Sequence, residues 1–252
     1  MRKLKVKLVR LGELPFKLNF NRIKKFTSSI FEIDAEISEF NLKNTRCSKY
    51  IDTYKDNELE NQIPTPEQGV DFVLAITNCV LKDDYYARRL ADKKAVFTFR
   101  NTRHWLEKAH LPLENAVLKM LYEYCIIFNR ETNCIRKNVD IGFLHHETRS
   151  CLFDFDDVLE DVIFSFNQPK ICEECAAKWI ERGTPKNMIE TTRKELKRLK
   201  KTLFYRIFDI VKKHPLISMT ISAIGMISIN IFSSWLPHLI SWLYHFICKL
   251  CK

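Results

Sequence analysis

One stretch near the C-terminal end constrains this chain more than any other, because it contains no Asp, Glu, Lys or Arg between His214 and Cys248. A helix from Leu216 to Leu236 would be about 31 Å long, which matches the roughly 30 Å of a bilayer core. The alternative is the buried core helix of a soluble protein, but such helices rarely run this far without a charge. The aromatic residues expected at a membrane interface are present as Trp235, Trp242 and Tyr244. We therefore predict a membrane segment over residues 214–252.

A basic connector precedes this segment. Residues 193–213 contain nine basic side chains against Glu195 and Asp209, a local charge of +7. Such a run beside an apolar span indicates attraction to anionic lipid headgroups before it indicates a nucleic-acid patch. The positive-inside rule then predicts a single pass through the inner (cytoplasmic) membrane, with the N-terminal domain in the cytoplasm. The residues after Pro237 are too few for a second span, so we expect them to lie in the membrane interface or to fold back as a re-entrant hairpin.

The first 185 residues have the pattern of one α+β domain. Apolar runs predict strands at residues 2–11, 71–77 and 94–99, with further strand-like pieces at 16–20 and 29–37 around a stretch that also suits a helix. Helical spacing predicts a long helix over 112–128 and shorter ones at 156–166 and 172–182. We expect a mixed β-sheet with flanking helices and a zinc knuckle in 1–185, a helical connector in 186–213 and the membrane segment in 214–252.

Two further observations concern phosphate-binding loops and the cellular compartment of the cysteines. The five glycines form no G-x-G-x-x-G, and no G-x-x-x-x-G-K-[ST] is present, so glycine-rich phosphate-binding loops are excluded. Residues 1–10 lack the apolar core of a secretory signal. We therefore expect the nine cysteines to lie in a reducing compartment, as thiols or metal ligands.

One spacing of histidines and cysteines stands out: His145-His146-x4-Cys151-x20-Cys172-x2-Cys175. Zinc takes four soft or borderline ligands in a tetrahedron, and a CxxC at the start of a helix provides two of them from one turn. We predict a structural Zn²⁺ bound by His146, Cys151, Cys172 and Cys175, with His145 as a substitute ligand. The alternative is a set of small buried residues that binds no metal.

These residues resemble the C-terminal half of the archaemetzincins, a family of zinc metallopeptidases with the signature H-E-x-x-H-x-x-G-x3-H-C-x4-C-x-M-x17-C-x-x-C. His145 falls on the third catalytic histidine and Phe153 on the methionine of the signature. The four structural cysteines correspond, with one residue inserted, to His146, Cys151, Cys172 and Cys175. The resemblance covers about residues 70–182 and implies a metzincin-like domain with a structural zinc.

The residues that the family's peptidase chemistry requires are missing. Counting back from His145, the H-E-x-x-H positions hold Cys134, Ile135 and Asn138, and no histidine lies between His110 and His145. Two histidines one helical turn apart bind the catalytic zinc in such enzymes, and the glutamate activates the zinc-bound water. We therefore expect a degenerate metzincin without catalytic activity.

Two further groups of residues are candidates for chemistry. The acidic cluster of Asp154, Asp156 and Asp157 is better explained by capping of the helix that follows. Cys125 and Cys134 are candidate nucleophiles, but Cys125 lies on the apolar face of the predicted long helix and is expected to be an inert thiol.

The sequence favours a membrane-anchored, non-enzymatic protein that binds, senses or acts on an unknown partner at the inner face of the membrane. Polar residues in the span, such as Asn230, favour self-association in lipid. A small cytosolic domain fused to a membrane segment resembles the effectors of bacterial anti-phage systems in its architecture. The alternative is a membrane-tethered zinc peptidase with a non-standard site, formed for example by His145, Cys134 and a carboxylate. Nucleic-acid binding by residues 193–206 is the weakest hypothesis, because membrane orientation explains the same charges.

Overall fold

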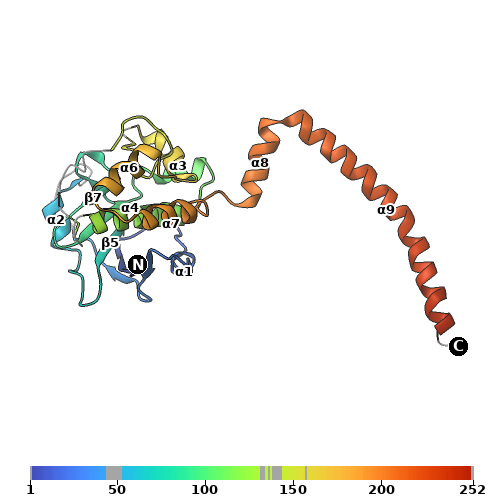
Figure 1. Cartoon of the computed structure of the whole chain (residues 1–252), viewed down its shortest axis with the longest axis horizontal. Helices are drawn as coiled ribbons and strands as arrows, with labels where there is room; N and C mark the ends of the chain where they lie inside the picture. Colours follow the sequence, from blue (N-terminus) through green and yellow to red (C-terminus); the bar gives the residue numbers. More distant parts are fainter. Residues whose placement is uncertain are drawn as a thin grey trace. The chain divides into compact units, whose positions relative to one another are not determined.

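The computed structural model describes residues 2–43, 53–130, 134–135, 137, 144–156 and 158–250, with the backbone alone for residues 130, 159 and 236–250. The chain forms two compact units, Met1–Lys201 and Thr202–Lys252. Each unit is described by itself, and Figure 1 labels the elements that belong to each.

A mixed sheet forms the centre of the first unit. Its order is β2 (Phe31–Ile33), β1 (Leu4–Leu11), β5 (Phe72–Thr77), β8 (Lys94–Thr98) and β7 (Ala87–Arg89), and β3 (Ser38–Phe40) also pairs with β1. Every pair is parallel except β7 with β8, which is antiparallel. The strands predicted at 2–11, 71–77 and 94–99 are confirmed, and so is the α+β class with a mixed sheet and flanking helices.

Two hydrophobic cores lie on opposite faces of this sheet. In β5, Phe72, Leu74 and Ile76 face the larger core, while Val73 and Ala75 face the smaller one. This alternation follows from the two-residue period of a strand, and burial on both faces explains the continuous apolar run in the sequence. The smaller core is closed by side chains from β4 (Thr53–Tyr54), α2 (Asp56–Glu60) and β6 (Val80–Leu81).

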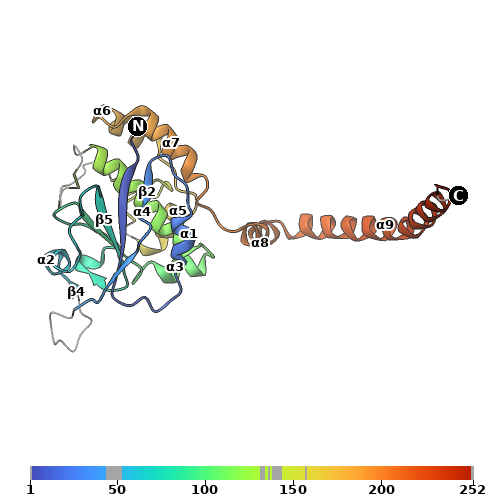
Figure 2. The same ribbon diagram turned by 90° about the horizontal axis from the view of Figure 1, so that it is seen from below.

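The helix α4 (Leu113–Arg130) fills the larger core and lies along the sheet (Figures 1 and 2). Its first residue follows Pro112, which suits a helix start because proline has no N–H to leave unsatisfied. Nearly every described side chain from Ala116 to Phe128 is buried. The predicted helix over 112–128 is confirmed, and it is more deeply buried than a surface helix with one apolar stripe.

Two segments of the N-terminal half differ from the sequence expectation. Residues 16–20 do not form a strand; they lead into the short helix α1 (Phe20–Lys24), whose N-cap Asn19 accepts a hydrogen bond from the Arg22 N–H at 3.0 Å. The capping bond and the burial of Ile23 outweigh the weak alternation of apolar residues. The region 41–68, whose polar composition is typical of an irregular loop, contains α2 and β4, and β4 pairs with β6 outside the main sheet.

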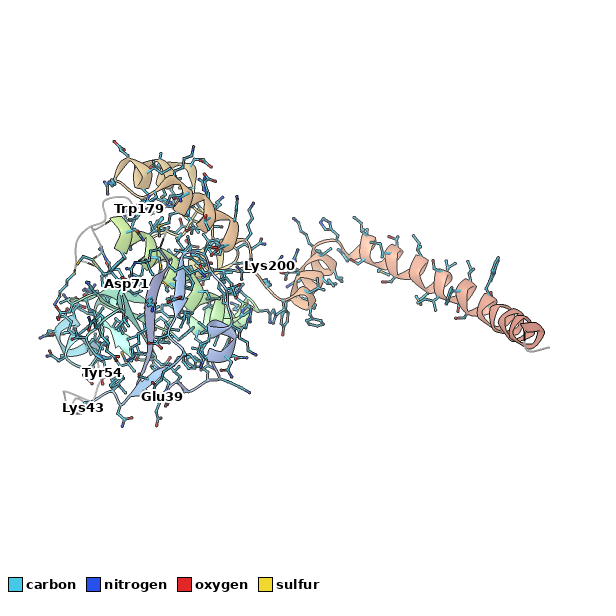
Figure 3. All side chains as sticks on the ribbon, turned by 60° about the horizontal axis from the view of Figure 1, so that its bottom comes forward. Glu39, Lys43, Tyr54, Asp71, Trp179 and Lys200 are labelled. Atoms are coloured by element: carbon cyan, nitrogen blue, oxygen red, sulfur yellow. The ribbon has the colours of Figure 1, made fainter. Side chains whose placement is uncertain are left out.

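The other described helices of the first unit are shorter than α4. They are η1 (Lys82–Asp84), α3 (Arg103–Lys108), η2 (Leu159–Asp161), α5 (Val162–Phe166), α6 (Glu173–Glu181) and α7 (Lys186–Leu196). Trp179 of α6, labelled in Figure 3, is fully buried and packs its ring 4.8 Å from that of Phe153. The large aromatic pair fixes α6 against the loop that precedes it.

The first unit extends beyond the expected boundary at residue 185 as far as Lys201, because α7 packs into the larger core. Its buried apolar side chains include Met188, Ile189 and Leu196. The Glu195 carboxylate accepts hydrogen bonds from Tyr122 Oη and Ser28 Oγ, both at 2.6 Å. The first part of the expected connector over 186–213 is therefore part of the folded unit.

The second unit consists of α8 (Leu203–Lys213) and α9 (Pro215–Leu250). Within the residues that the structure describes, Pro215–Trp235 is the helix long and apolar enough to cross a membrane, and none of it is buried. The helix continues through Pro237, so the backbone does not fold back there. The side chains of Trp242, Tyr244 and Cys248 lie outside the described part, as does all of Cys251.

The packing of α7 gives a first prediction. Ile189→Ala should lower the free energy of unfolding of the first unit by about 2–5 kcal/mol, because it removes a fully buried side chain and leaves a cavity. The measurement is chemical unfolding of the full chain in detergent, followed by near-ultraviolet circular dichroism. Glu190→Ala, an exposed position on the same helix, should change the value by no more than about 0.5 kcal/mol. Equal effects of the two variants would contradict the packing of α7.

Candidate metal centre

The candidate metal centre is built on the loop 144–156, whose backbone pairs with the segment before α6. Residues 144–156 form two isolated bridges, His145 with Asp154 and Cys151 with Lys170. The backbone bonds of the second bridge run from Leu152 N to Lys170 O at 2.7 Å and from Lys170 N to Ser150 O at 2.9 Å. These bonds bring Cys151 next to Cys172, although 20 residues separate them in the sequence.

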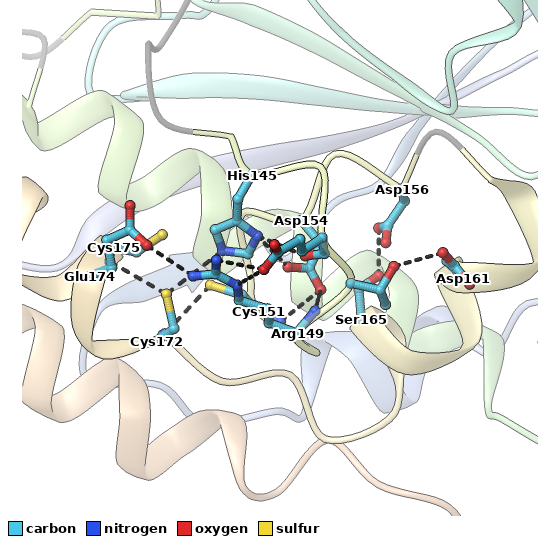
Figure 4. A network of polar contacts seen from close by, with 12 residues as sticks. His145, Arg149, Cys151, Asp154, Asp156, Asp161, Ser165, Cys172, Glu174 and Cys175 are labelled. Atoms are coloured by element: carbon cyan, nitrogen blue, oxygen red, sulfur yellow. Dashed lines mark hydrogen bonds and ion pairs between the residues drawn. The ribbon is translucent and has the colours of Figure 1, made fainter.

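The side chains of His145, Cys151, Cys172 and Cys175 converge at this point (Figure 4), with their ligand atoms all within 4.8 Å of one another. The Nε2 atom of His145 lies 3.6 Å from the Sγ atom of Cys172. A tetrahedral zinc with Zn–S of about 2.3 Å and Zn–N of about 2.0–2.1 Å requires a nitrogen–sulfur separation of about 3.6 Å. Both the donor types and this spacing therefore fit Zn²⁺.

The CxxC pair starts α6. Cys172 is the N-cap residue, and its Sγ accepts a hydrogen bond from the Cys175 N–H at 3.4 Å. The Cys172 N–H in turn lies 3.5 Å from Cys151 Sγ and donates to it. Backbone N–H groups at a helix start favour negative charge, so the fold already provides the electrostatics that a cluster of thiolates needs.

The pKa values of Cys151 and Cys175 are shifted in opposite directions. The pKa of Cys151 is lowered to about 5, chiefly because the Cys175 thiol donates a hydrogen bond to it, with further help from the Cys172 N–H. The pKa of Cys175 is raised, first by that same hydrogen bond and then by burial. The hydrogen bonds of the site therefore favour the thiolate form of Cys151, and thiolate is the form that binds metal.

The Nδ1 atom of His145 is hydrogen-bonded to the carbonyl oxygen of Glu147 and lies within ion-pair distance of a carboxylate. This atom lies 2.9 Å from Asp154 Oδ1 and 3.1 Å from the carbonyl oxygen of Glu147, both of which are acceptors. The ring proton therefore belongs on Nδ1, and Nε2 presents its lone pair to the cysteines. The other oxygen of Asp154 accepts from the N–H groups of Cys151 at 2.9 Å and Arg149 at 3.1 Å, as Figure 4 shows. Carboxylate–histidine pairs of this kind orient zinc ligands in many proteins.

The structure brings together the three predicted cysteines and His145, which the sequence suggested only as a substitute. His146, the histidine preferred from the sequence, is outside this group, and its ring packs 5.4 Å from that of Phe155. Neighbouring residues of an extended segment point to opposite sides, so only one of the two histidines can face the cysteines. That these residues bind a metal stays a prediction.

Sequence reasoning missed the role of Asp154, which it placed in a helix cap. The carboxylate instead lies under the loop, and burial raises its pKa. Its position three residues after Cys151 was visible in the sequence, but the contact with His145 depends on the loop closing on itself. Of the other candidates, Cys125 is buried in α4 and burial raises its pKa, whereas Asp157 lies outside the described residues.

A cleft of about 520 Å³ adjoins the site and is lined by charged and aromatic residues. Asp154 belongs to its lining, so the carboxylate that orients His145 also forms part of the cleft wall. The antiparallel edge strand β7 contributes Arg88 and Arg89, and α4 contributes Glu123. Arg88 is held in a two-point ion pair with Asp56, at 2.9 and 2.7 Å.

A buried polar network lies beside this cleft. Lys119 is fully buried; desolvation lowers its pKa, but Glu123 and Asp156 raise it by more, so the ammonium keeps its charge. Its Nζ lies 3.1 Å from Glu123 Oε2 and 4.7 Å from the ring centre of Phe166. Asp156 accepts from Ser165 at 2.5 Å, and burial raises its pKa to about 6. A paired buried charge of this kind holds the cleft wall in one arrangement.

Comparison with known proteins adds one likeness. No protein-family model and no curated protein matches this sequence. Among solved structures, the archaemetzincin of Methanopyrus kandleri superposes with a TM-score of 0.47 at 16% identity, covering 71% of this chain and 95% of that chain. Because the likeness is this weak, the function must be argued from the chain's own residues.

The carboxylate gives a second prediction. Asp154→Asn should weaken zinc binding by about 10–100-fold, because the amide no longer fixes the tautomer and direction of the His145 ring. The measurement is competition for zinc with a chromophoric chelator. Glu147→Gln is the control, because its side chain is exposed and its backbone carbonyl stays in place. Equal affinities of Asp154→Asn and the parent would contradict the orienting role.

Proposed function

We propose that this chain is a membrane-anchored protein whose folded unit is closed by a structural Zn²⁺ and binds or senses a partner at the cytoplasmic face without catalysing a reaction. One observation supports this most: His145 and three cysteines converge from two segments, and a buried carboxylate lies 2.9 Å from Nδ1 of the histidine. The zinc would join the loop 144–156 to α6. When bound, it supplies a cross-link rather than a reactive water, because four protein ligands fill a tetrahedral site.

The alternative, a zinc peptidase with a non-standard site, has less support. That proposal needs His145 to bind a second zinc together with Cys134 and a carboxylate, but His145 lies with Cys151, Cys172 and Cys175. Cys134 is outside that group. The sequence also contains no H-E-x-x-H, so the glutamate that would activate a zinc-bound water is missing from its expected place. The number of zinc ions per chain separates the two proposals.

The cleft beside the metal centre is the place where we propose that a partner binds. It is concave, combines three tyrosines with two arginines, and shares Asp154 with the candidate metal centre. A zinc that fixes the loop 144–156 would therefore also fix one wall of the cleft. A sensor in which partner binding depends on zinc follows from this shared residue.

The membrane part of the proposal rests on α9. Its first 21 residues are long and apolar enough to cross a bilayer, and the basic residues just before them favour a cytoplasmic first unit. Asn230 and the serines of the span would favour self-association in lipid. A role as an effector in bacterial anti-phage defence is a narrower proposal, supported by the combination of a small domain and a membrane segment alone.

Metal content gives the third prediction. The full chain purified in detergent should contain one zinc, and the variant Cys172→Ser, Cys175→Ser should lose it together with its cooperative unfolding, because the site depends on both thiolates. The measurement is elemental analysis beside thermal unfolding. Cys79→Ser is the control, since Cys79 lies at β6 and outside the metal group.

Each other result for metal content has a definite meaning. Two zincs in the parent, of which one survives in the double variant, would favour the peptidase proposal. No zinc in the parent, when it is purified without chelators, would contradict the ligand assignment itself.

Membrane attachment gives the fourth prediction. Ile224→Arg with Ile227→Arg should release the chain from the membrane fraction, because an arginine at the centre of a span costs about 2.5–3.5 kcal/mol on insertion. The measurement is fractionation after an alkaline carbonate wash. Val158→Arg is the control, because it adds charge at an exposed apolar position of the first unit. A parent chain that leaves the membrane in the wash would contradict the proposed span.

A further inference from the structure

The helix α8 is divided into two faces. At 100° per residue, the six apolar side chains fall on one continuous face, which consists of Leu203, Phe204, Ile207, Phe208, Ile210 and Val211. The remaining side chains occupy the opposite face as Tyr205, Arg206, Asp209, Lys212 and Lys213. The sequence of the connector as a whole is basic and polar, and the separation appears only when Leu203–Lys213 is taken as one helix.

The apolar face of α8 is exposed in the structure. Leu203 and Phe204 are each 69% exposed, Ile210 is 59% exposed, and α8 has no buried residue. A contiguous apolar surface of this kind, on a helix that also has a charged face, is unfavourable in water and marks a surface that another phase or partner covers.

The helix α8 is also separate from the span that follows it. Its C-cap His214 has φ −132° and ψ 65°, which breaks the helix, and α9 begins at the next residue, Pro215. Figure 1 labels the two as distinct helices. Because a single residue separates them, the C-terminal end of α8 lies at the bilayer surface where α9 enters a bilayer.

The basic residues around the apolar face of α8 indicate an anionic partner for this helix. The polar face of α8 carries Arg206, Lys212 and Lys213 against Asp209, and the preceding segment adds Lys197, Arg198, Lys200 and Lys201. Basic residues beside an apolar helix face match an anionic lipid surface, because the charges meet the headgroups while the apolar side chains reach the acyl chains.

We propose that α8 lies in the plane of the cytoplasmic headgroup layer, with its six apolar side chains inserted into a bilayer that contains anionic lipid. The proposal deepens the proposed function and rests on it, because α9 must bring α8 to the membrane. It assigns a second lipid contact to the chain, distinct from the span. The approach of the folded unit to the membrane would then depend on the anionic lipid content of the cytoplasmic leaflet.

The test is hydrogen–deuterium exchange of the full chain in nanodiscs that contain one chain each. Exchange is compared in discs with about one-third anionic phospholipid and in discs of neutral phospholipid alone. We expect amides of α8 to exchange about tenfold more slowly in the anionic discs. Phe204→Ser should remove most of this protection, and Phe204→Ser with Ile207→Ser should remove all of it.

The control is Tyr205→Ser, which also removes one aromatic ring but from the opposite face of the same helix. It should leave the protection within about twofold of the parent, since serine has a similar effect on helix propensity at both positions. Equal loss of protection in Phe204→Ser and Tyr205→Ser would overturn the proposal, because it would mean that helix stability rather than face insertion sets the exchange.

Two further results would overturn the proposal in different ways. Fast exchange in α8 beside slow exchange in α9 would leave the membrane anchor intact and remove the in-plane helix alone. Protection of α8 that appears only in discs with two or more chains would assign its apolar face to a second copy of this chain. Fast exchange in α9 itself would instead mean that the proposed membrane anchorage has failed.

Discussion

The burial of α4 against a sheet whose central strands are covered on both faces is the constraint on which the first unit depends. Strands β5 and β8 have no solvent-facing side, so helices and short strands must cover both faces. The helix α4 takes the larger face, and α7 closes it with Glu195 bonded to Tyr122. Everything that forms the metal centre is then connected to this core through Phe153, Trp179 and the segment between them.

The metal centre and the cleft are joined by one carboxylate. Asp154 holds the loop through two backbone N–H groups, lies 2.9 Å from Nδ1 of His145 and lines the cleft. Because Asp154 makes all three contacts, a movement of its side chain would change the loop, the surroundings of His145 and the cleft together. Metal binding at this site and the shape of the cleft would therefore be coupled. The residue that they share is the physical reason to propose a binding or sensing role, because it links the candidate metal centre to the cleft.

The two helices of the second unit, α8 and α9, differ in how their apolar residues are distributed. The first 21 residues of α9 contain no charged side chain and are apolar enough on average for a span, whereas α8 confines its apolar residues to one face. Lysines and arginines concentrate before and within α8, and none lies between Pro215 and Cys248. The same charges that favour a cytoplasmic first unit are therefore placed where a headgroup layer would meet them.

The sequence alone determined several parts of this protein. The strands at 2–11, 71–77 and 94–99, the long helix after Pro112 and the apolar helix after His214 follow from patterns of apolar residues, which burial imposes directly on the sequence. The cysteine spacing was likewise sufficient to choose Cys151, Cys172 and Cys175. The sequence left the stretch after Phe20 open between strand and helix, because a single capping bond and one buried side chain leave little periodicity.

Only the tertiary structure decided between His145 and His146, because adjacent residues have equal spacing to the cysteines and differ solely in the side to which they point. The tertiary structure also showed that Asp154 lies next to His145. It showed that the first unit includes α7, whose mostly polar sequence contains only a few buried residues. It also showed the two faces of α8, since the boundaries of a helix must be known before its faces can be. The pattern of apolar residues along one helix or strand reflects which of its side chains are buried. Which histidine faces the cysteines, where Asp154 lies and where the first unit ends depend instead on contacts between different segments of the chain.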